Sequence, residues 1–97
     1  MSINVVLELQ AAEGKAAELI AVLKASLGDT RAREGCEGLT THQDQDNPNT
    51  IVLIERWASR ANYETYLAWR AGPGAMPAMA GLVAGPPTIR YFNDVDA

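Results

Sequence analysis

The sequence predicts an α+β fold, a ferredoxin-like βαββαβ plait in which two helices cover one face of a four-stranded antiparallel sheet. Two observations lead to this prediction. Four segments have the composition of strands, and two segments carry apolar residues at helical spacing. They follow one another in the order strand, helix, strand, strand, helix, strand. No internal boundary interrupts the 97 residues, so we expect a single domain over residues 1–97.

The first half of the chain supplies a strand, a helix and a hairpin strand. Residues 3–10 alternate apolar and polar side chains, which is typical of a strand with one buried face. Over residues 13–33 the apolar residues recur at helical spacing, and Gly35 suits the left-handed conformation that ends helices. A second strand is expected over residues 39–43. The turn residues at 46–49 then predict a hairpin.

The second half begins with the other arm of that hairpin, a strand over residues 50–57. A helix is expected over residues 59–70, because its first residue is a serine able to cap it and its aromatic residues fall at helical spacing. Residues 71–87 are rich in Gly, Ala and Pro and predict a mobile loop or lid, with one or two helical turns at 77–83. A last strand is expected over residues 88–93.

The sheet carries more apolar surface than two helices can cover. Residues 51–54 are all apolar, so this strand is apolar on both faces, and Val5 with Val6 repeats the pattern on the first strand. Soluble monomers rarely expose such a patch on the face that the helices leave open. The pattern therefore predicts a two-fold homodimer joined sheet to sheet.

Composition excludes several classes of partner. The formal net charge is −4, so neither a nucleic-acid backbone nor an anionic membrane is an expected partner. No apolar run approaches the ~20 residues that span a bilayer, and the N-terminus lacks the apolar run of a signal peptide. The single cysteine, Cys36, cannot form an internal disulfide and is interpreted as a small buried hydrophobe. These features favour a cytoplasmic protein.

Several short motifs occur in a fixed order between about residues 3 and 93. They are Gly14-Lys15-x-x-Glu18-Leu19, Thr30-Arg31, Glu34-Gly35-Cys36, Asp46-x-Pro48, Glu55-x-Trp57 and Ser59-x-x-x-Tyr63. The series resembles the antibiotic biosynthesis monooxygenase domains of the dimeric α/β-barrel superfamily. That resemblance implies a dimer of ferredoxin-like plaits and a pocket between sheet and helices in each subunit. It also implies oxygenation of electron-rich aromatic substrates without metal or flavin.

Such a reaction requires the substrate itself to supply an electron to O2. A phenol or hydroquinone must lose a proton inside an apolar cavity, where a few donors stabilise the anion and one group accepts the proton. The candidates for catalysis are Trp57, Tyr63, Glu55 and His42. The candidates for substrate binding are Tyr66, Trp69, Met76 and Met79, the two methionines forming an adaptable lid.

Each candidate also has a purely structural interpretation. The aromatic side chains can simply pack in the core. Glu55 lies on a face that should be buried, so either its pKa is raised and it acts as a base, or an arginine such as Arg90 or Arg56 holds it. We favour the ion pair. His42, the only histidine, lies near a hairpin turn, where exposed histidine is ordinary.

Departures from the family pattern keep more than one function open. Haem-degrading relatives ligate iron through a histidine on the second helix, and residues 59–70 contain none, which excludes haem ligation by that route. One histidine and one cysteine cannot assemble a zinc site, so no metal is expected, and the resemblance implies that no other cofactor is needed. The preferred function is a cofactor-independent monooxygenase acting on a quinol or polycyclic phenol. The alternatives are a non-catalytic small-molecule-binding or stress-associated dimeric barrel, and an isomerase or cyclase.

Overall fold

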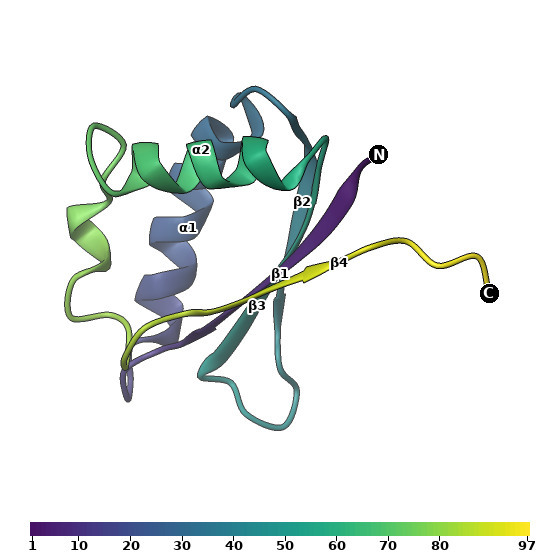
Figure 1. Cartoon of the computed structure of the whole chain (residues 1–97). Helices are drawn as coiled ribbons and strands as arrows, with labels where there is room; N and C mark the ends of the chain where they lie inside the picture. The colour runs from purple at the N-terminus through teal and green to yellow at the C-terminus, as the bar shows by residue number, and fades with distance from the viewer.

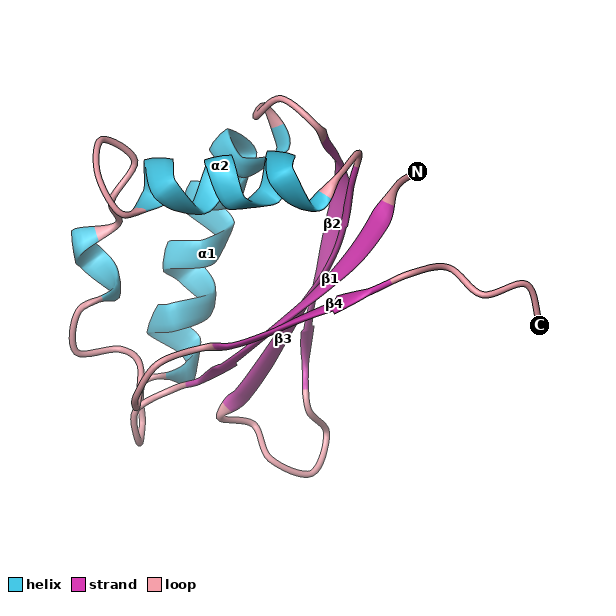
Figure 2. Ribbon diagram, viewed as in Figure 1, coloured by secondary structure: helices cyan, strands magenta, loops and turns pink.

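The computed structural model describes residues 1–97 and has the predicted βαββαβ order (Figures 1 and 2). The elements are β1 (Ile3–Gln10), α1 (Ala16–Arg31), β2 (Cys36–Gln43), β3 (Thr50–Trp57), α2 (Arg60–Arg70), the short 3₁₀ helix η1 (Pro77–Met79) and β4 (Thr88–Phe92). The strands form one antiparallel sheet in the order β2-β3-β1-β4. Both helices lie on the same side of this open sheet, as Figure 1 shows. The predicted fold class is therefore confirmed.

Two boundaries differ from the prediction by three residues: α1 begins at Ala16, later than expected, and β2 begins at Cys36, earlier than expected. A β-bulge between Cys36 and Gly38 shifts the register there, and Gly38 has a φ of 136°. The bulge interrupts the alternation of apolar and polar residues, so the pattern conceals the start of the strand. Gly35 has the predicted left-handed conformation after α1, with a φ of 87°.

The segment between α2 and β4 is held at both ends by backbone hydrogen bonds. At its start, Gly74 N donates to Trp69 O at 2.8 Å. At its end, Ala12 N donates to Leu82 O at 2.8 Å, and Ala84 N donates to the last residue of β1 at 2.7 Å. An isolated bridge pairs Val83 with Ala11, the residue after β1, and the helical turns predicted over 77–83 are limited to Pro77–Met79.

The helix α2 begins as the sequence predicts. Ser59 has extended backbone angles, and its hydroxyl accepts a hydrogen bond from Asn62 N at 3.1 Å. This bond satisfies one of the N–H groups that have no partner within the helix. The cap fixes the point at which α2 leaves β3, and thereby places the aromatic residues of the helix over the sheet.

The core between sheet and helices divides into two clusters. The leucine cluster lies toward one end and contains Leu9, Ala11, Leu19, Leu23, Leu27, Leu39, Ile51, Leu53 and Leu82. The aromatic cluster contains Val5, Trp57, Tyr63 and Tyr66. Alternation along each strand points these side chains toward the helices and their neighbours toward the opposite face.

The opposite, outer face of the sheet carries an apolar strip. Val6 on β1 pairs with Ile54 on β3, and Val52 lies two residues before Ile54 on the same strand. Ile54 is 47% exposed, and Phe92 at the end of β4 is 45% exposed. Residues 51–54 are therefore apolar on both faces, as the sequence predicts. None of the helices is both long enough and apolar enough to cross a membrane.

Candidate functional site

A cavity of about 160 Å³ lies between the sheet, α2 and the segment after α2; we call it the inner cavity. Eleven of its fourteen lining residues are hydrophobic, and the charged groups in its wall are Glu55 and Arg70. An engineered cavity of about 150 Å³ with apolar walls binds benzene. The inner cavity therefore has room for one aromatic ring, with a carboxylate and a guanidinium as its charged contacts.

Glu55 lies on β3 and is only 3% exposed. Trp57 Nε1 donates a hydrogen bond to Glu55 Oε1 at 3.0 Å, and no basic side chain lies within 4.0 Å of the carboxylate. Burial raises the pKa of Glu55, and the bond from Trp57 offsets part of that rise. A carboxylate with a raised pKa is suited to accept a proton near neutral pH.

The predicted ion pair between Glu55 and an arginine is wrong. Arg56 follows Glu55 on the same strand, so its side chain points to the outer face, where Arg56 Nη2 lies 2.9 Å from Asp94 Oδ2. On the same face, Arg56 Nε lies 3.5 Å from Glu37 Oε1. Arg90 pairs in register with Val6 and belongs to the same outer face. The one-residue alternation of the strands keeps both arginines away from Glu55.

Tyr63 presents a free hydroxyl at the wall of the inner cavity. Its ring packs edge-on against Trp57, with the centroids 5.4 Å apart, and its hydroxyl forms no hydrogen bond within the protein. Burial, followed by the nearby charge of Glu55, raises the pKa of Tyr63 far above its usual value. The hydroxyl therefore stays protonated and can donate a hydrogen bond to a bound oxyanion. Trp57 itself is fully buried behind Tyr63 and does not line the cavity.

Tyr66 is held by a network that the sequence analysis missed. Its hydroxyl lies 2.8 Å from Thr30 Oγ1 and accepts a hydrogen bond from Arg70 Nε at 2.9 Å. Two sequence signals could have found these partners. Thr30 continues the helical spacing of Leu23 and Leu27 and so lies on the buried face of α1. Arg70 follows Tyr66 by four residues, the distance at which helical side chains meet.

The remaining candidates are divided between three places. Those that line the inner cavity are Glu55, Tyr63, Tyr66, Met76 and Met79. Trp69 lies outside this cavity. His42 is on the outer face of the sheet, where its ring nitrogen Nε2 lies 2.8 Å from Thr40 Oγ1, so the structure does not bring it to the inner cavity. The roles assigned to these residues stay predictions.

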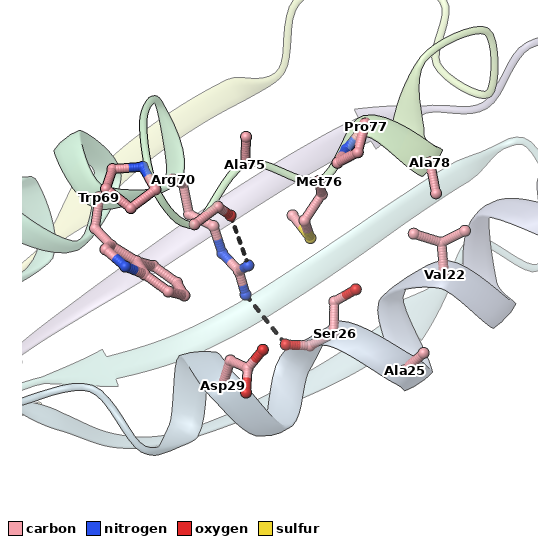
Figure 3. A pocket seen from close by; sticks show the side chains of 12 residues that line it. Val22, Ala25, Ser26, Asp29, Trp69, Arg70, Ala75, Met76, Pro77 and Ala78 are labelled. Atoms are coloured by element: carbon pink, nitrogen blue, oxygen red, sulfur yellow. Dashed lines mark hydrogen bonds between the residues drawn. The ribbon is translucent and has the colours of Figure 1, made fainter.

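A second and larger space, the outer cavity, has a volume of about 330 Å³ and lies between α1 and residues 73–78 (Figure 3). Trp69 forms part of its wall. The loop passes directly over this indole ring at Gly74, where even a Cβ atom would collide with the ring. Arg70 and Met76 line both the outer and the inner cavity.

No group of three or more His, Cys, Asp or Glu side chains lies close enough together to hold a metal ion. The titratable groups of the inner cavity with a shifted pKa, Glu55 and Tyr63, are suited to proton transfer. A carboxylate with a raised pKa and a protonated phenol line the same apolar space. The carboxylate can accept a proton from an acidic group of a bound aromatic compound, and the phenol can donate a hydrogen bond to the resulting anion.

Comparison with solved structures supports the fold along nearly the whole chain. PA3566 from Pseudomonas aeruginosa is 22% identical with a TM-score of 0.82, over 98% of this chain and 95% of that one. SnoaB, a cofactor-independent oxygenase from Streptomyces nogalater, is 20% identical with a TM-score of 0.80, over 99% and 95%. No curated protein sequence matches. The family model for antibiotic biosynthesis monooxygenase matches residues 2–75. The chain therefore belongs to the antibiotic biosynthesis monooxygenase family.

Proposed function

We propose that this chain is a cofactor-independent monooxygenase that oxidises an electron-rich aromatic substrate, a quinol or a polycyclic phenol, with O2. One observation carries the proposal: Glu55, with a raised pKa and no cationic partner, borders an apolar cavity of single-ring size. Membership of the family and the fold shared with SnoaB, a cofactor-independent oxygenase, support it.

The reaction would begin when the hydroxyl of the substrate loses its proton to Glu55. The resulting anion gives one electron to O2, and the radical pair combines at a ring carbon that still bears hydrogen. Glu55 returns its proton to the peroxide, and loss of water from the hydroperoxide leaves a carbonyl. One oxygen atom enters the product, the other leaves as water, and the substrate supplies all the electrons.

Two side chains would assist the first step. Trp57 holds one carboxylate oxygen of Glu55 and so fixes the orientation of the base. Tyr63 remains protonated and would donate a hydrogen bond to the substrate oxyanion, a group whose charge grows as the proton leaves. The apolar walls exclude water and thereby strengthen both interactions.

Oxygen uptake by metal-stripped protein tests the proposal. With a panel of hydroquinones and anthrones, at least one substrate should consume O2 above the uncatalysed rate. Glu55→Gln should lower the rate by about 10²–10⁴-fold, the usual contribution of a general base. Tyr63→Phe should lower it by about 10²–10³-fold, as loss of one oxyanion donor does.

Tyr91→Phe is the matched control. Tyr91 packs edge-on against Tyr63, with centroids 5.8 Å apart, but does not line the inner cavity, so its hydroxyl should not affect the rate. Tight binding of these compounds without oxygen uptake would contradict the oxygenase and favour a non-catalytic binding barrel. Conversion of a ligand without oxygen would favour an isomerase or cyclase.

We also propose that two copies of the chain pair through the outer face of the sheet. The apolar strip formed by Val6, Val52 and Ile54, extended by Phe92, supports this pairing, because monomers rarely leave such surface uncovered. Pairing would place two sheets face to face, as in a dimeric α/β barrel.

Sedimentation at low micromolar concentration tests the pairing. The wild type should have about twice the 10.4 kDa mass of the chain. Ile54→Asp should give a folded monomer, because the substitution puts a charge at the centre of the strip. A wild type that sediments as a monomer would contradict the dimer and leave the proposed reaction untouched.

A further inference from the structure

The outer cavity is an unassigned space that meets the proposed active site at two side chains. Arg70 and Met76 line both cavities. In Figure 3 these two side chains extend from the α2 side toward α1, where Ser26 and Asp29 face them. Methionine is unbranched and flexible, so a rotation of Met76 would join the two spaces without movement of a helix.

Arg70 is held by uncharged groups alone, and no carboxylate pairs with it. Its guanidinium donates to four oxygens of the protein: Tyr66 Oη at 2.9 Å, Gly74 O at 3.0 Å, Ser26 O at 3.1 Å and Thr30 Oγ1 at 2.9 Å. All four belong to uncharged groups. A guanidinium has five N–H donors, so one hydrogen of Nη1 has no partner in the protein.

The size of the inner cavity makes a second compartment necessary for larger substrates. About 160 Å³ holds a single aromatic ring, so the further rings of a polycyclic substrate, and any substituent, must extend elsewhere. The outer cavity, about twice as large, lies directly beyond Arg70 and Met76. A substituent that passes these side chains meets an unpaired positive charge first.

We propose that the outer cavity is a second compartment of the substrate site and holds a carboxylate-bearing substituent of the aromatic substrate against Arg70. The inference rests on the proposed function, in which the reacting ring occupies the inner cavity. A carboxylate is the group best matched to a guanidinium, because the two form charge-assisted hydrogen bonds. The remaining Nη1 hydrogen supplies the first of these bonds.

The charge of Asp29 restricts where the substrate carboxylate can bind in the outer cavity. This exposed carboxylate lines the same cavity but does not come within 4.0 Å of Arg70 to form an ion pair. It repels an anion at its own side of the space and leaves the side of Arg70 favourable. Removal of the charge of Asp29 should therefore strengthen the binding of an acid, whereas removal of the charge of Arg70 should weaken it.

Calorimetric titration without oxygen tests the inference separately from turnover. The probes are 4-hydroxyphenylacetate, 3-(4-hydroxyphenyl)propanoate and 4-(4-hydroxyphenyl)butanoate, each compared with its primary amide and with phenol. At least one acid should bind about tenfold more tightly than its amide, the effect of one charge-assisted hydrogen bond. Asp29→Asn should increase this preference, and Arg70→Gln should abolish it.

A matched pair of variants keeps the test valid if Arg70→Gln does not fold. Ala25 and Ala21 lie one turn apart on α1 and are both exposed, but Ala25 lines the outer cavity and Ala21 lines neither cavity. Ala25→Leu should therefore reduce the affinity gained from the acidic substituent, and Ala21→Leu should not. Equal affinity for acid and amide in the wild type and in Asp29→Asn would overturn the inference. If phenol binds in that case, the inner site and the proposed function stand; if nothing binds, both fail.

Discussion

The leucine cluster and the aromatic cluster lie on the same face of the same sheet, yet they differ in the polarity of their side chains. The leucine cluster is hydrocarbon throughout. The aromatic cluster surrounds a buried carboxylate, Glu55, and carries two phenolic hydroxyls on Tyr63 and Tyr66. The leucine cluster therefore contributes hydrocarbon packing, and four of its members also line the inner cavity, whereas the aromatic cluster lies against a desolvated carboxylate. Variants in the two clusters should differ in kind as well as in size.

The largest effect is expected in the leucine cluster. Leu19 is fully buried and does not line the inner cavity. Leu19→Ala should lower the free energy of unfolding by about 2–5 kcal/mol, because it leaves a void that the neighbours fill only in part. Urea denaturation measures the change, with the exposed neighbour Glu18→Ala as control. A loss below about 1 kcal/mol would show that this half of the core can collapse around a void.

Trp57→Phe should have the next largest effect, because it combines packing with a lost hydrogen bond. The substitution removes the only donor to the buried carboxylate of Glu55, and an unsatisfied buried group costs about 1–3 kcal/mol. It should also raise the pKa of Glu55 further, since the bond from Trp57 is what lowers it. The double variant Trp57→Phe, Glu55→Gln measures the coupling. Because the amide oxygen of glutamine can still accept this bond, the coupling reports the part of the bond that depends on the charge of the carboxylate, and additive effects would show that this part is zero.

The two buried tyrosines should separate stability from catalysis. Tyr66→Phe removes a hydroxyl bonded to Thr30 and Arg70 and should cost about 1 kcal/mol of unfolding free energy. Tyr63→Phe removes a hydroxyl that has no partner and should leave the unfolding free energy nearly unchanged. Parallel urea denaturation of the two variants measures the difference. Equal losses would mean that the Tyr63 hydroxyl is bonded in solution.

Glu55→Gln should change the free energy of unfolding by an amount that depends on pH. The folded protein binds the Glu55 proton more tightly than the unfolded chain does, because burial raises the pKa above 4.5. Wild-type stability from this group is therefore complete below pH 4.5 and falls as pH rises through the folded pKa. The variant lacks this fall and should be the more stable protein at pH 8. Denaturation at pH 4, 6 and 8 measures the trend, which a constant difference would contradict.

Much of the fold, and part of the candidate site, could be predicted from the sequence. The spacing of apolar residues gave the order of the elements, and the serine at residue 59 gave the start of α2, because both depend on neighbours along the chain. The buried face of Glu55 was predicted correctly, but its ion pair was wrong, because Arg56 and Arg90 both lie on the outer face of the sheet. The network of Arg70 reaches Ser26 and Thr30, which are 44 and 40 residues earlier in sequence, and local patterns do not encode such contacts.

The anchoring of the segment between α2 and β4 has a practical consequence for protein engineering. Backbone bonds hold it at Gly74 and at Leu82 to Ala84, and the match to the family model stops at residue 75. Residues 75–81 are therefore a cassette with defined splice points that borders both cavities. Exchange of this cassette with the corresponding residues of a relative should alter which ligands bind while the sheet and both helices stay intact. A library restricted to these seven positions would explore new specificity at little risk to folding.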